Sequence, residues 1–132
     1  MSLKAIGAKI FAKIAVHQIN QWASNPLETQ ERVFKKLIAT AKNTAFGKDH
    51  GFAGIASYQD FFAKVPVRDY EALRNYVDRV VAGEKDILWP GKPLYFAKTS
   101  GTTSGAKYIP LTKESMPTHI IAARNAILCY IH

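Results

Sequence analysis

Apolar residues recur at helical spacing along the first part of the chain, which predicts a long helix over residues 3–22. Lys9 and Lys13 lie off the apolar stripe, so the helix is basic and amphipathic. We expect this helix to pack on the body of the protein, and contact with an anionic membrane surface is the alternative. The stripe consists of Leu3, Ile6, Ile10 and Ile14.

A second helix is predicted to begin at Pro26, because proline fits the first helical position and either Ser24 or Asn25 can cap it. Glu28 and Glu31, near its start, favour the positive end of the helix dipole. Its apolar face comprises Val33, Phe34, Leu37, Ile38 and Ala41.

Glycine and proline divide the middle of the chain into short pieces. Gly47 and Gly51 bracket residues 46–52, which we expect to form a loop. Residues 65–67 are predicted to be extended, because a residue before proline avoids the α region. Residues 88–91 are typical of a turn.

Capping residues predict three further helices, and two short apolar runs predict strands at 94–97 and 108–110. The fold class is therefore mainly α with a small β element, an α+β arrangement. We expect residues 1–132 to be an incomplete part of a larger domain, since so few strands do not make an independent sheet. The caps are Ser57 for a helix to about residue 64, Asp69 for a helix ending at Gly83, and Thr112 for a last helix over 113–131.

The last predicted helix is strongly apolar and reaches Ile131 without a glycine or proline stop signal. We therefore expect a truncated piece of a longer protein, in which other sequence covers this helix. Alternatively, a second copy of the chain covers the apolar face of this helix, so we predict self-association through the last helix. Cys129, among apolar neighbours, is expected to be a buried filler, and a single cysteine fits a reducing cytosol.

The formal charge of +8 favours acidic partners, but the basic residues are scattered from Lys4 to Arg124. A nucleic-acid reader more often gathers them into a stripe, so we expect a nucleotide and no nucleic acid. No run reaches the ~18 apolar residues of a membrane span. We expect a cytoplasmic protein without a membrane partner.

The segment from Thr99 to Lys107 carries the candidate chemistry, because seven consecutive small residues, two of them glycine, precede an alanine and a lysine. Glycine allows the backbone to bend tightly, successive N–H groups can surround an anion, and lysine adds a positive charge. This pattern is typical of a phosphate-binding loop. The alternative is a flexible hairpin loop, because serine, threonine and glycine favour turns. The candidate binding residues are Ser100, Gly101, Thr102, Thr103, Ser104, Gly105 and Lys107.

The spacing of glycine, lysine and histidine residues does not match a P-loop or a metal site. A P-loop needs four residues between its glycines and a Gly-Lys-Ser/Thr ending, whereas three residues lie between Gly101 and Gly105, and Ala106 precedes Lys107. The four histidines are far apart in the sequence, with no cysteine or carboxylate at metal-ligand spacing. We expect no metal site made by this chain alone.

Four segments together, residues 46–52, 65–70, 88–93 and 99–110, resemble the N-terminal part of the auxin-responsive promoter family. Its members are acyl-acid amido synthetases within the acyl-adenylate-forming superfamily. The resemblance implies that the chain is an N-terminal fragment of the large α/β domain of such an enzyme. Ser104 and Tyr108 stand where the broader superfamily usually has glycine.

The resemblance also implies a reaction. ATP, with Mg²⁺, would adenylate a carboxylic acid, and the acyl group would pass to an amine or amino acid. Residues 100–105 would contact the β- and γ-phosphates, and Lys107 would add charge near the leaving pyrophosphate. The adenine pocket, the acid pocket and the catalytic residues would lie beyond position 132. We therefore expect the chain alone to be inactive, and the rival interpretation is a stand-alone helical binding module without catalysis.

Overall fold

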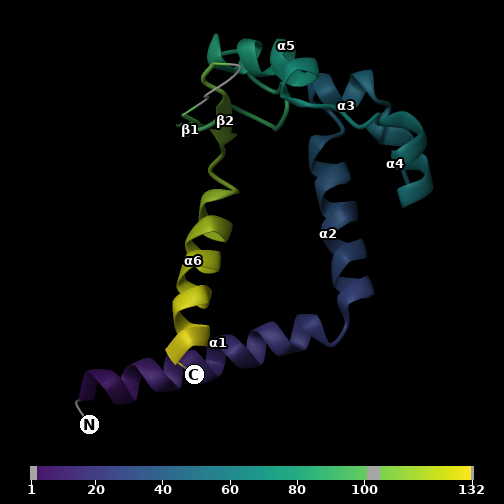
Figure 1. Cartoon of the computed structure of the whole chain (residues 1–132). Coiled ribbons are helices and arrows are strands. Elements are labelled where there is room, and N and C mark those ends of the chain that lie inside the picture. Colours follow the sequence, from purple (N-terminus) through teal and green to yellow (C-terminus); the bar gives the residue numbers. More distant parts are fainter. Residues whose placement is uncertain (1–2, 101–104, 132) are drawn as a thin grey trace. The chain divides into compact units, whose positions relative to one another are not determined.

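The computed structural model describes residues 3–100 and 105–131 of the chain. These residues fold into two compact units, one formed by Met1–Arg32 with Glu114–His132 and the other by Val33–Lys113. The described residues form six α-helices, one 3-10 turn and a single pair of strands, and Figure 1 shows how they follow one another along the chain. The prediction of a mainly α fold with a small β element is confirmed.

The first unit is built on the packing of α1 (Leu3–Ala23) against α6 (Met116–Ile131). Ala12 and Ala15 are the buried residues of α1, because small side chains let two helix backbones approach closely. Helix α1 therefore packs on another helix, as expected, but the larger apolar stripe is not the packed face. Its residues are 43–86% exposed, namely Leu3, Ile6, Ile10 and Ile14.

The start of α6 lies three residues later than the sequence predicted, so Thr112 is not its cap. The amide of His119 donates to the carbonyl of Ser115, which places the helix start after Ser115. Pro117 then falls in the first turn, where a missing N–H costs nothing. The expectation that Cys129 is buried was also wrong, since it is exposed on α6.

The second helix, α2 (Pro26–Ala41), begins at the predicted proline. The hydroxyl of Ser24 donates to the carbonyl of Asn20 at the end of α1, and the carbonyl of Asn25 accepts the first helical bond of α2 from Thr29. On its predicted apolar face Ile38 and Ala41 are buried, whereas Val33 and Leu37 remain about half exposed.

The core of the second unit is formed by Ile38, Ala41, Phe52 and Ile55, with half-buried aromatic and aliphatic side chains around them. It lies between the end of α2 and a series of short elements, two of which have the caps that the sequence predicted. Ser57 and Asp60 form a complete capping box, and the side chain of Asp69 accepts from the amide of Ala72. These elements are α3 (Ala45–Asp49), η1 (Phe52–Gly54), α4 (Tyr58–Lys64) and α5 (Tyr70–Val81).

The expected loop at residues 46–52 is instead mostly helical, because Thr44 caps α3 with its side chain. Gly47 is buried inside this helix and does not mark a bend. Gly51, by contrast, adopts the left-handed conformation between α3 and η1. Only one of the two glycines therefore acts as a turn residue.

Two short strands form an antiparallel hairpin, β1 (Tyr95–Lys98) and β2 (Tyr108–Leu111), close to the predicted positions. The register pairs Tyr95 with Leu111 and Lys98 with Tyr108. Helix α5 contacts β2. None of the helices within the described ranges has the length and apolar character needed to cross a membrane.

Candidate phosphate-binding hairpin

The candidate loop connects β1 to β2, so its two ends are held next to one another. Beyond the last strand pair, the amide of Thr99 donates to the carbonyl of Lys107 at 3.0 Å. The amide of Lys107 donates back to the hydroxyl of Thr99 at 3.3 Å. Thr99 therefore closes the base of the loop with both its backbone and its side chain.

Three of the predicted binding residues belong to the part of the chain that the structure describes, and Gly101, Thr102, Thr103 and Ser104 lie outside it. Ser100 and Gly105 are exposed at the two sides of the loop, and Lys107 is half-buried at its base. The described residues therefore bring a hydroxyl, a glycine and a lysine to the same end of the hairpin.

Gly105 has the backbone conformation that the sequence pattern predicted for a tight bend. Its φ is +80°, a region that side chains rarely adopt, and a Cβ placed there would meet no atom of the described residues within 4 Å. Glycine is therefore required here by backbone conformation and not by crowding.

Lys107 is held by an aromatic side chain from α5. Its ammonium lies 5.4 Å from the centre of the Tyr70 ring, within the range of a cation–π interaction. The hydroxyl of Tyr70 accepts a hydrogen bond of 2.9 Å from the amide of Tyr108, which follows Lys107 and is the first residue of β2. The sequence predicted the lysine but not this contact.

A second lysine lies at the same end of the hairpin. Lys98 is the last residue of β1, and its ammonium lies 5.9 Å from the ring of Tyr108. Since Lys98 pairs with Tyr108 and Thr99 lies opposite Lys107, the two lysines project from opposite faces of the hairpin. The sequence analysis missed Lys98. Since side chains alternate between the two faces of a strand, a lysine at the end of the strand that enters the loop could have been recognised as a second candidate.

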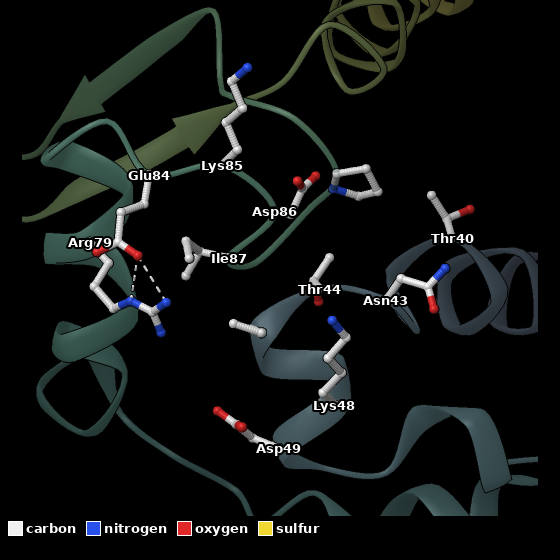
Figure 2. A pocket seen from close by; sticks show the side chains of 12 residues that line it. Thr40, Asn43, Thr44, Lys48, Asp49, Arg79, Glu84, Lys85, Asp86 and Ile87 are labelled. Atoms are coloured by element: carbon white, nitrogen blue, oxygen red, sulfur yellow. Dashed lines mark hydrogen bonds and ion pairs between the residues drawn. The ribbon is translucent and has the colours of Figure 1, made fainter.

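A cleft of about 910 Å³ lies near α3 in the second unit, and no sequence motif had predicted it. Figure 2 shows Lys48 and Asp49 projecting from α3, opposite Arg79 of α5 and the segment 84–87. Both signs of charge are present. Three basic and three acidic side chains line the cleft, so their formal charges balance.

Several charged groups of the cleft already have partners within the chain. The guanidinium of Arg79 bonds the carboxylate of Glu84 at 2.9–3.0 Å (Figure 2). The carboxylate of Asp86 accepts from the amide of Gly91 at 2.7 Å. These bonds stabilise the walls of the cleft, and we assign it no ligand.

Metal ligation has no support among the residues that the structure describes, where no group of three or more His, Cys, Asp or Glu could hold an ion. His50 is buried, and its Nδ1 lies 2.8 Å from the carbonyl of Phe46. Its ring also stacks on the ring of Phe46. His50 therefore has a local structural role at the end of α3.

Comparison with known proteins identifies the class to which this fold belongs. The model of the GH3 family N-terminal domain matches residues 15–131. The chain is 32% identical over 124 residues to indole-3-acetic acid-amido synthetase GH3.15 of Arabidopsis thaliana, covering 91% of this chain and 20% of that protein. It is 25% identical over 118 residues to jasmonoyl--L-amino acid synthetase JAR6 of Nicotiana attenuata, covering 88% of this chain and 20% of that protein.

The chain belongs to the GH3 family, which confirms the resemblance drawn from its four sequence segments. It spans about a fifth of the length of the curated relatives it matches. The matched region includes the whole hairpin and the helix that anchors it.

Proposed function

We propose that the chain is the N-terminal part of an ATP-dependent ligase that joins a carboxylic acid to an amine or amino acid. The names of the relatives support the acid and amino acid substrates. The observation that carries the proposal is the hairpin end, where Gly105 at positive φ and Lys107 stand beside an exposed serine. The proposed larger domain would be completed by the part of such proteins that this chain does not cover.

The described residues suit the polyphosphate of ATP. Ser100 offers a hydroxyl, and Gly105 allows close approach of the backbone. The ammonium of Lys107 can donate a strong, charge-assisted hydrogen bond to a phosphate oxygen. When bound, ATP with Mg²⁺ supplies the adenylyl group that activates the acid and the pyrophosphate that leaves. We propose that residues 100–105 and Lys107 hold the phosphates and offset the charge that develops on the pyrophosphate.

Binding of sodium tripolyphosphate and of Mg·ATP to the chain, measured by isothermal titration calorimetry, tests this proposal. A Lys107→Ala variant should lose at least about tenfold in affinity, since a charge-assisted hydrogen bond contributes about 1.5–3 kcal/mol. Absence of binding by the wild-type chain at millimolar ligand would refute the phosphate site.

Glycine at positive φ offers a matched pair of variants. Gly105 and Gly91 have φ of +80° and +77°, and a Cβ at either position would meet no atom of the described residues within 4 Å. Gly105→Val and Gly91→Val should therefore strain the backbone similarly, by about 1–2 kcal/mol. Only Gly105→Val should weaken tripolyphosphate binding. An equal loss in both variants would mean that the effect comes from the fold and not from the site.

We also propose that the 132-residue chain alone has no ligase activity, because it would hold only one part of the site. Incubation with Mg·ATP, a panel of carboxylic acids and an amino acid mixture should yield no amide by mass spectrometry. Any amide formed above a boiled control would contradict this. Self-association through α6 stays a prediction, which sedimentation velocity over a range of concentrations tests.

A further inference from the structure

Tyr70 joins the start of α5 to the base of the candidate hairpin through two separate contacts. Its hydroxyl accepts a hydrogen bond of 2.9 Å from the amide of Tyr108, and the centre of its ring lies 5.4 Å from the ammonium of Lys107. One side chain thus contacts two consecutive residues of the chain. All three residues are half-buried, so neither contact is fully exposed to water.

The hydrogen bond to Tyr70 satisfies an amide on the outer side of β2. Tyr108 pairs with Lys98 in the register of the hairpin, and its N–H donates to Tyr70 of α5. A half-buried N–H without an acceptor would be costly. The bond therefore fixes β2 against α5 at the residue where the loop returns to the sheet.

The cation–π contact restricts the ammonium of a long and otherwise mobile side chain. A lysine loses considerable rotamer entropy when a ligand fixes it, and a side chain that is already oriented loses less. The ring of Tyr70 holds the positive charge of Lys107 at the base of the loop without neutralising it. A carboxylate at this position would instead compete with a phosphate for the lysine.

The helix that carries Tyr70 is itself fixed in place. Tyr70 is the first residue of α5, directly after the cap Asp69, whose side chain accepts from the amide of Ala72 at 2.9 Å. Farther along α5, Val77 and Val80 are buried. The position of Tyr70 is thus set by a capped helix with a packed face.

We propose that Tyr70 is a positioning residue for the phosphate site, which orients Lys107 and anchors the returning strand of the loop. This inference rests on the proposed function of the hairpin. Tyr70 acts through Lys107 and Tyr108 and does not itself contact the phosphates. The sequence pattern alone pointed only to the loop and its lysine.

Two variants of Tyr70 separate its two contacts. Tyr70→Phe removes the hydroxyl and keeps the ring, whereas Tyr70→Leu removes both. In the free chain, the ring should shift the side-chain protons of Lys107 upfield in the NMR spectrum. Tyr70→Phe should keep that shift and speed hydrogen exchange of the Tyr108 amide, and Tyr70→Leu should abolish the shift. A wild-type Lys107 with random-coil shifts would overturn the proposal before any ligand is added.

Sodium tripolyphosphate binding then tests the role of this contact. Tyr70→Leu should weaken affinity about fivefold, the size expected for an oriented cation over a ring, and Tyr70→Phe should weaken it about twofold at most. In a Lys107→Ala background, Tyr70→Leu should lower the affinity for tripolyphosphate less than twofold. Tyr76→Leu, on the same helix but away from the hairpin, is the control and should leave affinity unchanged.

The outcomes distinguish the two proposals. If the wild-type chain does not bind tripolyphosphate, the phosphate site is refuted, and the role of Tyr70 with it. If wild type binds but Tyr70→Leu binds equally well, only the positioning role is refuted. A loss in Tyr70→Leu that persists fully in the Lys107→Ala background, or that Tyr76→Leu reproduces, would show a general effect on the fold and also overturn that role.

Discussion

The hydroxyl of Thr44 accepts a hydrogen bond of 3.0 Å from the amide of Gly47 and donates one of 2.7 Å to the carbonyl of Ala41. This one side chain thereby links the end of α2 to the first turn of α3. Thr44 is only 1% exposed. The amides of Ala45 and Phe46 donate to the carbonyls of Asp86 and Ile87, and the amide of Lys48 donates to the carbonyl of Thr44. Every N–H of the first turn of α3 is thus satisfied.

Replacement of Thr44 should destabilise the second unit more when the hydroxyl is lost than when only the methyl group is lost. Thr44→Val leaves the amide of Gly47 without its acceptor, whereas the carbonyl of Ala41 keeps its bond from the amide of Thr44, so we expect a loss of about 2 kcal/mol in the free energy of unfolding. Thr44→Ser keeps the hydroxyl and loses a methyl group, which should cost about 1 kcal/mol. Urea denaturation followed by circular dichroism measures both. Equal losses in the two variants would contradict the role assigned to the hydroxyl.

Gly47 should tolerate no side chain, although it is helical. A Cβ at this position would collide with the carbonyl oxygen of Ala41. We therefore expect Gly47→Ala to destabilise the chain by about 3 kcal/mol or more. Gly7 in α1 is the matched control, because a Cβ there meets nothing within 4 Å. Gly7→Ala should raise stability by up to about 1 kcal/mol. Thermal unfolding that shows Gly47→Ala to be neutral would contradict the collision.

Local signals in the sequence predicted most of the elements, because their causes are local. Ser57 and Asp69 cap the helices that were assigned to them, and the hairpin strands lie within one or two residues of their predicted positions. Capping depends on a few neighbouring residues, and strand patterns on a short stretch of chain.

The features that the sequence did not reveal depend on residues far away along the chain. Helix α3 is stabilised by the carbonyls of Asp86 and Ile87, about 40 residues beyond it. Ala12 and Ala15 of α1 face α6, and no periodicity distinguishes them from other alanines. The contact between Lys107 and Tyr70 likewise joins residues that only the folded chain brings together.

Asp60 should stabilise the chain at neutral pH and cease to do so in acid. Hydrogen bonds from the amide of Ala56 and from the hydroxyl and amide of Ser57 lower the pKa of Asp60 below its ordinary 3.8. Because the folded-state pKa is depressed, this contribution is complete above the unfolded pKa and is lost as pH falls through the folded one. NMR titration of the Asp60 carboxyl should show the lowered pKa, and Ser57→Ala should raise it. An Asp60 that titrates at or above its ordinary pKa would contradict the capping-box assignment.

Tyr76 should give the opposite pH dependence. Its hydroxyl donates a 2.7 Å hydrogen bond to the carboxylate of Asp49, linking α5 to α3. Desolvation and this acidic neighbour raise the pKa of Tyr76 above its ordinary 10.0. Because the folded-state pKa is raised, the stabilisation is complete below the unfolded pKa and is lost as pH rises through the folded value.

The free energy of unfolding of the wild-type chain should therefore fall as pH rises above about 10, and that of Tyr76→Phe should fall less steeply. The other tyrosines ionise in both proteins, so the difference between the two curves isolates Tyr76. Urea titrations from neutral pH to about pH 11 provide the measurement. Asp49→Asn removes the negative neighbour but keeps the tyrosine, and should give an intermediate slope. Parallel curves for wild type and Tyr76→Phe would show that Tyr76 has the same pKa in the folded and unfolded chain, and would contradict the link between α3 and α5.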